Sequence, residues 1–196
     1  MSSKSRHYSS PPKNAQEAEN SKHQGNLLFQ KQKYAAACEL YTEAILQSEQ
    51  KWHVPYLNRA MANEKRLRWK EAKEDLEKCL KLDHDNVKAT YHLGVCVCML
   101  PEEIEDNYKK GAEILEKSLF LAREYDESQV DLIWRSLAKS KYMEHCEKAK
   151  ERRKVYESLE AKLSHPGFVP LTEDDARVLR ERVNEAKEKD ERKQAP

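Results

Sequence analysis

The sequence predicts an all-α fold in which three stacked helix-turn-helix repeats form a superhelical cradle and a long helical hairpin follows. Three observations support this fold class. The 196 residues are 36% charged and 38% hydrophobic and include only 4 glycines, which is typical of helices with two contrasting faces. A pattern of aromatic, small and large side chains recurs three times. A thin apolar stripe then runs through a highly charged region.

The chain divides into three parts by composition. Residues 1–15 form a leader that contains serine and proline and is polar, which predicts disorder. Residues 16–123 hold the three repeats, and residues 124–192 hold the long C-terminal helical hairpin. A chain of this length has room for one elongated domain or two small ones, so we expect no large globular core.

The repeat is visible when the segments 32–45, 67–80 and 106–119 are aligned. In the first segment, Tyr34 is followed by the small Ala37, the large Tyr41 and the small Ala44. The other two segments carry the same order of aromatic, small, large and small residues: Trp69, Ala72, Leu76 and Cys79, then Tyr108, Gly111, Leu115 and Ser118. Each segment predicts the second helix of a pair whose small residues let the neighbouring helix approach closely.

The first helices of the pairs are predicted near residues 17–31, 52–65 and 86–100. Gly25 and Ala60 precede the small residue of the next helix by an equal interval in the first two pairs. In the third pair the corresponding interval, from Gly94 to Gly111, is longer by about five residues. These extra residues must lengthen the turn between the two helices or extend one of the helices.

The period and the alternation of small and large residues resemble the tetratricopeptide repeat, which has about 34 residues per unit. This resemblance implies a right-handed superhelix whose concave wall is lined by the first helices. Such a wall is a cradle for an extended peptide. Asn63 stands where the family usually packs a large apolar residue. The second repeat is therefore either locally loose or satisfies this amide internally.

Polar residues gather at the positions of the first helices that face this groove. Lys22 and Asn26 lie four residues apart and share one face of the first helix. Asn58 lies at a comparable place in the next repeat, and Lys88 and His92 lie in the third. Asparagine is a poor residue for a helix interior, so two of them here indicate selection for something other than folding. Lysine and asparagine are also common solvent-facing residues, and it is their joint occurrence that predicts a site.

This arrangement resembles the two-carboxylate clamp of tetratricopeptide co-chaperones. Three pieces carry the resemblance: KHQGN at 22–26, LNRA at 57–60 and NVKATYHLG at 86–94. It implies that the groove binds the C-terminal Glu-Glu-Val-Asp of cytosolic heat-shock chaperones of the seventy- and ninety-kilodalton classes. A terminal aspartate offers two carboxylates, which ammonium and amide groups can satisfy. By this resemblance Lys22, Asn26 and Asn58 hold the α-carboxylate. Lys88 meets the aspartate side chain.

Two further residues complete the predicted peptide-binding site. His92 stands where the family often has arginine. Histidine lacks the forked hydrogen bonding of arginine, so this departure predicts a weaker clamp whose affinity is mildly pH-dependent. Tyr91 is expected to supply an apolar wall for the peptide residues that precede the terminus.

After the repeats the sequence predicts one long helix that begins near residue 126. Its first apolar residues are expected to pack back onto the third repeat: Val130, Ile133, Trp134, Leu137 and Met143. SHPGFVPL at 164–171 breaks this helix, and a second helix through about residue 190 completes the hairpin. The apolar stripe of the hairpin is too narrow to be buried alone, which predicts a homodimer through the hairpin.

The stretch IWRSLAKSKYMEHCE at 133–147 narrows the resemblance to the CHIP family of ubiquitin-ligase co-chaperones. The similarity runs from about residue 16 to about residue 160, and it implies a role in protein quality control and in ubiquitylation of chaperone clients. Members of that family end in a U-box, which recruits the ubiquitin-conjugating enzyme. The residues needed to build a U-box are absent from this chain, so it is either a fragment or a relative without that module.

Composition argues against several other partners. The net charge of +1 provides no global basic field, so neither nucleic acid nor a membrane is expected as a partner. KAKERRK at 148–154 is interleaved with acidic residues in the surrounding helix, which indicates a solvated face. No apolar stretch approaches the roughly 20 residues that cross a bilayer, and the first residues are too polar for a secretory signal. The cytoplasm is the expected location, with the nucleus as an alternative.

The 5 cysteines lack CxxC pairing, and most fall at apolar helical positions. This pattern favours a structural role over a metal or redox role. The sequence shows no glycine-rich phosphate loop, no paired Cys/His ligands and no nucleophile-base pair, so we expect no cofactor, no metal and no catalysis by this chain alone. The alternative function is a scaffold or adaptor that binds other C-terminal peptides without any link to ubiquitin.

Overall fold

The computed structural model describes residues 14–100, 106–163 and 173–194, and these residues contain helices and no strand. The helices follow in this order: α1 (Ala15–Gln30), α2 (Tyr34–Gln47), α3 (His53–Lys65), α4 (Trp69–Leu82), α5 (Val87–Cys98), α6 (Asn107–Tyr125), the 3₁₀ turn η1 (Glu127–Gln129), α7 (Val130–Leu163) and α8 (Glu173–Gln194). The predicted all-α fold class is confirmed. The predicted leader falls mostly on residues 1–13, outside the described residues.

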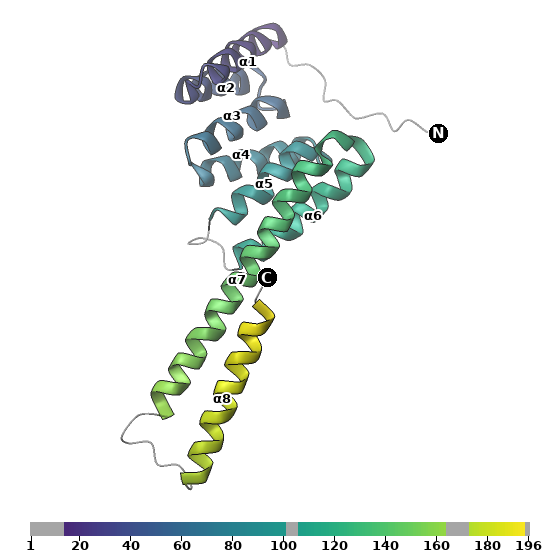
Figure 1. The fold of residues 1–196 in the computed structure, drawn as a ribbon. Helices are drawn as coiled ribbons and strands as arrows, with labels where there is room; N and C mark the ends of the chain where they lie inside the picture. The colour runs from purple at the N-terminus through teal and green to yellow at the C-terminus, as the bar shows by residue number, and fades with distance from the viewer. Residues whose placement is uncertain (1–13, 101–105, 164–172, 195–196) are drawn as a thin grey trace. The chain divides into compact units, whose positions relative to one another are not determined.

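The first six helices pack as three successive pairs, as Figure 1 shows. α1 packs on α2, α3 on α4 and α5 on α6, and the pairs stack through α2 with α3 and α4 with α5. The ends of α1, α3 and α5 lie within two residues of the predicted boundaries. The hydrophobic pattern of the repeat therefore locates these helices well.

Small residues lie where the helices of a pair meet most closely, as the repeat pattern predicts. A Cβ atom on Gly25 would lie 2.6 Å from Cε1 of Tyr41, and one on Gly94 would lie 2.8 Å from Cγ of Leu115. Ala60 and Ala72 are fully buried. Since real Cβ atoms do not approach other atoms this closely, larger residues at the glycine positions would push the helices apart.

The extra residues of the third repeat lie between its two helices. Three residues separate α1 from α2 and α3 from α4, whereas eight separate α5 from α6. Helix α5 ends at Cys98 and α6 begins at Asn107, so neither helix extends into this junction to include the extra residues. Of the two options left by the sequence, the longer connection is the one found. Residues 101–105 within it lie outside the described residues.

Asn63 is buried and its side-chain oxygen is satisfied internally, which resolves the second question that the sequence leaves open. Its Oδ1 lies 3.5 Å from Sγ of Cys38 and accepts a hydrogen bond from Nη1 of Arg66 at 3.3 Å. The two donors come from α2 and from the residue that follows α3. The structure accommodates a polar side chain at this buried position because two neighbours donate to its oxygen.

The chain forms two compact units, Met1–Lys141 and Tyr142–Pro196. The first part of α7 belongs to the unit with the repeats, where Ile133 and Leu137 are buried in a cluster with residues of α5 and α6. Trp134 does not join them, because 56% of its surface is exposed. The expectation that Trp134 packs onto the third repeat is therefore wrong: the core face of α7 passes through Ile133 and Leu137, four residues apart, and leaves its neighbour outside.

The second unit is a helical hairpin of the remaining part of α7 with α8, and Figure 1 shows the two helices side by side. Lys187 on α8 pairs with Glu160 on α7, with 3.1 Å between Nζ and Oε1. The predicted break at 164–171 lies outside the described residues. No helix in the described part of the chain combines the length and the apolar character that crossing a bilayer requires.

The cysteines all carry free thiols, and Cys38, Cys79 and Cys96 are buried among the repeat helices. Burial raises the pKa of the Cys79 thiol to about 12, so this group stays protonated at neutral pH. Within the described ranges, no three His, Cys, Asp or Glu side chains gather closely enough to hold a metal ion. The environment of these thiols is that of small packing residues.

Candidate functional site

The first helices of the three repeats lie next to one another, with α1 against α3 and α3 against α5. All six predicted site residues lie on these helices: Lys22 and Asn26 on α1, Asn58 on α3, and Lys88, Tyr91 and His92 on α5. Three separate segments of the sequence thus supply one wall of adjacent helices. We call this wall the groove wall.

The structure brings Asn26 and Asn58 into direct contact across α1 and α3. Nδ2 of Asn58 donates a hydrogen bond to Oδ1 of Asn26 at 3.1 Å, although the two residues are 32 positions apart. The hydroxyl of Tyr41, on α2, donates to the same oxygen at 2.9 Å. Every buried side-chain nitrogen and oxygen in the described residues has a partner, and Nδ2 of Asn26 has none among them. This amide group is therefore accessible to solvent or to a ligand.

Lys22 lies one helical turn before Asn26 on α1, and its side chain is only 18% exposed. Its Nζ pairs with the carboxylate of Glu19 and lies 5.2 Å from the ring centroid of Trp52, the residue that precedes α3. The aromatic face holds the ammonium group in place by a cation–π contact. An incoming carboxylate would compete with that of Glu19 for the same ammonium group.

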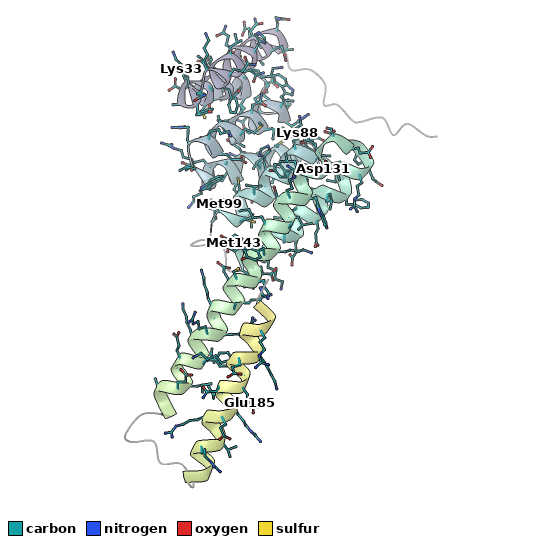
Figure 2. All side chains as sticks on the ribbon, viewed as in Figure 1. Lys33, Lys88, Met99, Asp131, Met143 and Glu185 are labelled. Carbon is teal, nitrogen blue, oxygen red and sulfur yellow. The ribbon has the colours of Figure 1, made fainter. Side chains whose placement is uncertain are left out.

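Lys88 is exposed in the first turn of α5, and Figure 2 labels its position. Helix α5 begins here because the side chain of Asn86 caps it, accepting a hydrogen bond from the backbone nitrogen of Ala89 at 2.9 Å. In the described part of the chain, the ammonium group of Lys88 has no ion pair or hydrogen bond. Its charge adds to the positive end of the helix dipole, so an anion is favoured at this end of α5.

His92 is held by a carboxylate from the neighbouring repeat. Its Nδ1 lies 2.9 and 3.0 Å from the two carboxylate oxygens of Glu64 on α3. The side chains are 18% and 13% exposed, so the pair is largely shielded from water. Because a carboxylate oxygen accepts hydrogen bonds, Nδ1 is the donor in this contact. Nε2 is the ring nitrogen that remains for solvent or a ligand.

Tyr91 packs between α5 and α7. Its hydroxyl lies 3.2 Å from Oγ of Ser136 on α7, and its ring meets that of His92 edge to face with centroids 5.0 Å apart. The ring also lies against the buried cluster that includes Ile133 and Leu137. The first part of α7 thus helps to set the position of a predicted site residue.

The predicted residues fall into two groups. Asn26 and Asn58 are hydrogen-bonded, with Lys22 one turn away on the same helix as Asn26. Lys88, Tyr91 and His92 share the first turns of α5. Across the ranges that the structure describes, no hydrogen bond or ion pair joins Lys88 to Lys22, Asn26 or Asn58.

Sequence reasoning missed several residues that contact the predicted ones, among them Trp52, Glu64 and Tyr41. Trp52 and Glu64 carry no motif that marks them. Tyr41 is different, because the equivalent position holds Leu76 and Leu115 in the other two repeats. The signal for Tyr41 was available in the sequence: it carries a hydroxyl at a position where leucine is sufficient for packing in the other repeats.

No protein-family model matches the sequence. The E3 ubiquitin-protein ligase CHIP of Arabidopsis thaliana is 37% identical over 131 residues, which are 65% of this chain and 44% of that protein. The chain thus spans less than half of the length of this relative.

Several solved structures of tetratricopeptide-repeat domains resemble the fold. The TPR2B domain of yeast Sti1, in its complex with pHsp70, matches with a TM-score of 0.60 and 23% identity over 65% of this chain and 98% of that one. The second TPR domain of human RPAP3, in complex with the HSP70 peptide SGPTIEEVD, matches with a TM-score of 0.55 and 26% identity over 64% and 96%. These matches confirm that the three helix pairs have the tetratricopeptide-repeat fold.

Proposed function

Because this chain has tetratricopeptide repeats and is homologous to CHIP over 131 residues, we propose that it is a co-chaperone binding module for the C-terminal tails of heat-shock chaperones. The observation that carries the proposal is the composition of the groove wall. Two hydrogen-bonded asparagines and a lysine lie on α1 and α3, and Lys88, which has no ion pair or hydrogen bond among the described residues, lies on α5. The solved RPAP3 domain with a similar fold holds an HSP70 peptide that ends in Glu-Glu-Val-Asp.

The chemistry of such a tail fits these groups as a two-carboxylate clamp. Lys22, Asn26 and Asn58 bind the α-carboxylate of the terminal aspartate, and Lys88 binds its side-chain carboxylate. Ammonium and amide nitrogens donate hydrogen bonds, and carboxylate oxygens accept them, so each contact is charge-assisted. Both the seventy- and the ninety-kilodalton chaperone classes are partners in this proposal.

His92 and Tyr91 complete the peptide-binding site in this proposal. His92 has only Nε2 left for the peptide, because Nδ1 is engaged by Glu64. It therefore makes at most one hydrogen bond, where an arginine would offer a fork. Tyr91 offers the side of its ring to the residues that precede the terminus.

The homology to a ubiquitin ligase supports a role in ubiquitylation as well as in peptide binding. In that role, the repeats hold a chaperone in the cytoplasm or nucleus, and the bound clients are ubiquitylated as part of protein quality control. The repeats supply recognition, and we assign no catalytic residue to this chain. The alternative is an adaptor that uses the same groove for other C-terminal peptides without any link to ubiquitin.

We assign the hairpin unit to self-association. None of the side chains described in this unit is buried, and Val155, Leu159 and Val178 are 57%, 40% and 40% exposed. Among the described residues, the two helices bury no apolar side chain against each other, and such a pair gains little stability from packing. A second copy of the hairpin, which carries the same stripe, would cover these residues in a coiled-coil-like homodimer.

The test of the clamp is a calorimetric titration with the peptide SGPTIEEVD and with its C-terminal amide. The free acid should bind and the amide should bind far more weakly, because amidation removes one of the two carboxylates. Lys88→Ala should weaken binding of the free acid by about 10- to 100-fold, the effect of losing a charge-assisted hydrogen bond of about 1.5–3 kcal/mol. The fold should not change, since Lys88 is exposed and unpaired among the described residues.

Lys78→Ala is the matched control, because Lys78 is an exposed lysine on α4, a second helix of a pair. It should leave the affinity unchanged. Equal binding of the acid and the amide would contradict the clamp and favour the general adaptor. A parallel titration with SRMEEVD, a ninety-kilodalton chaperone peptide, ranks the two chaperone classes.

A further inference from the structure

We infer that Tyr41 is a positioning residue of the groove wall, whose hydroxyl orients the amide of Asn26 so that Nδ2 is presented to the ligand carboxylate. This inference rests on the proposed function. It adds a residue from α2, which is not one of the three helices of the groove wall but packs against α1.

The orientation follows from the two hydrogen bonds at one oxygen. Oδ1 of Asn26 accepts from the Tyr41 hydroxyl at 2.9 Å and from Nδ2 of Asn58 at 3.1 Å. An amide oxygen has two lone pairs, so both are occupied. Rotating the amide by half a turn would place the NH₂ of Asn26 against the NH₂ of Asn58, and two donors would face each other. The observed orientation leaves Nδ2 of Asn26 without an acceptor among the described residues.

The packing of Tyr41 explains why its hydroxyl reaches this oxygen. The ring is only 2% exposed and lies against Gly25, the residue before Asn26. A Cβ on Gly25 would lie 2.6 Å from Cε1 and 2.9 Å from Cδ1 of the ring, so a glycine is required for this approach. The leucines at the equivalent place in the other repeats fill the same kind of slot without a hydroxyl: Leu76 and Leu115. Packing alone therefore does not account for tyrosine here.

The hydroxyl is a stable donor across the pH range in which proteins bind peptides. Burial raises the pKa of Tyr41 to about 12, so the O–H group is retained well above neutral pH. The bond to Asn26 therefore does not switch off with pH. Any pH dependence of peptide binding must come from other groups of the groove wall.

The experiment uses Tyr41→Phe, which removes the hydroxyl and keeps the ring against Gly25. Affinity for SGPTIEEVD should fall by roughly three- to tenfold, the usual effect of losing one neutral hydrogen bond. Tyr34→Phe is the matched control, because Tyr34 lies on the same helix and its ring contacts Phe29 edge to face. The control should bind as the unchanged chain does. Thermal unfolding measures whether each variant keeps its fold.

A double-mutant cycle separates positioning from a general loss of structure. If Tyr41 acts through Asn26, then Tyr41→Phe should cause no further loss of affinity in an Asn26→Ala background. Additive losses, or an unchanged affinity in Tyr41→Phe alone, would overturn the inference. The cycle uses the full chain throughout.

Nuclear magnetic resonance tests the orienting role of Tyr41 in the absence of any peptide. In the free chain, the side-chain NH₂ signals of Asn26 should shift in Tyr41→Phe and stay in place in Tyr34→Phe. If no peptide binds the unchanged chain, the proposed function fails, while a shift of these signals still establishes that Tyr41 orients the amide. If the signals do not shift, the orienting role is refuted whatever the peptide does.

Discussion

Glycine residues mark the closest approach between helices in the repeats, and Gly111 is the most tightly enclosed of them. A Cβ at this position would lie 2.2 Å from Sγ of Cys98 and 3.0 Å from the backbone oxygen of Gly94. Cys98 has little freedom to move away, because its Sγ lies 3.2 Å from Oγ of Ser140. The backbone of α5 is equally fixed by its own helix. This residue therefore limits the spacing of the third helix pair.

Gly111→Ala should lower the free energy of unfolding by about 1–2 kcal/mol. Overpacking costs about 1–3 kcal/mol, and the better helix propensity of alanine returns up to about 1 kcal/mol, so the steric effect wins. Urea unfolding followed by circular dichroism measures the change. Lys110→Ala, at the exposed neighbouring position, is the control and should change stability by less than about 0.5 kcal/mol. A Gly111→Ala chain more stable than the original would show that the helices are not in contact here.

At the scale of elements, one buried ion pair connects three helices of the first two repeats. Arg59 on α3 donates from Nη2 and Nε to the two carboxylate oxygens of Asp75 on α4, at 2.7 and 2.8 Å. Its Nη1 donates to Oγ1 of Thr42 on α2 at 2.8 Å. The Asp75 side chain is 5% exposed and that of Arg59 is 19% exposed. The hydrogen bonds to Asp75 raise the pKa of Arg59 above its ordinary value. The guanidinium group thus fixes how α2, α3 and α4 meet.

Asp75→Ala should destabilise the repeats by about 2–4 kcal/mol, because it leaves the guanidinium group of Arg59 largely buried without its carboxylate. The partial exposure of Arg59 keeps the effect below that of a fully buried pair. Urea unfolding measures it, and Glu74→Ala, at the exposed position next to Asp75 on α4, should have almost no effect. A loss for Asp75→Ala no larger than for Glu74→Ala would mean that the pair adds nothing beyond a surface ion pair.

At the scale of the whole molecule, the two units differ in how they are stabilised. The repeat unit buries apolar clusters shared between successive helices. The hairpin unit buries none of its described side chains, and the ion pair of Lys187 with Glu160 connects its helices. A surface ion pair contributes at most about 1 kcal/mol, which does not hold two long helices together. Self-association is therefore the proposed source of stability for this unit.

Sedimentation velocity over a series of protein concentrations tests this proposal. The full chain should sediment as a dimer at high concentration, and Leu159→Gln should shift the equilibrium toward monomer because it places a polar amide in the proposed apolar interface. Ser158→Gln introduces the same side chain at the neighbouring exposed position and should leave the equilibrium unchanged. A chain that stays monomeric at every concentration would exclude the homodimer.

Much of the fold could be predicted from the sequence, because the same local pattern of small and large residues occurs three times. The helix pairs and their boundaries, and the tight fit at Gly25, follow from the periodicity of small and apolar residues. The exposed position of Trp134 could not be predicted in this way, since a rotation of about 100°, the angle between successive helix residues, decides which apolar residue of α7 meets the core. Hydrophobic periodicity predicts an apolar face about 100° wide, but it does not determine which residues at the edges of that face are buried.

The sequence by itself determined which helices carry the predicted site residues, since helix position follows from local spacing. Only the tertiary structure decided which of them touch: Asn26 with Asn58 and Tyr41, and His92 with Glu64. Each of these hydrogen bonds joins residues from different helices, and its geometry depends on the distance and rotation between those helices. Local pattern carries no information about the direction of an amide or an imidazole nitrogen, because packing between helices sets the side-chain conformer.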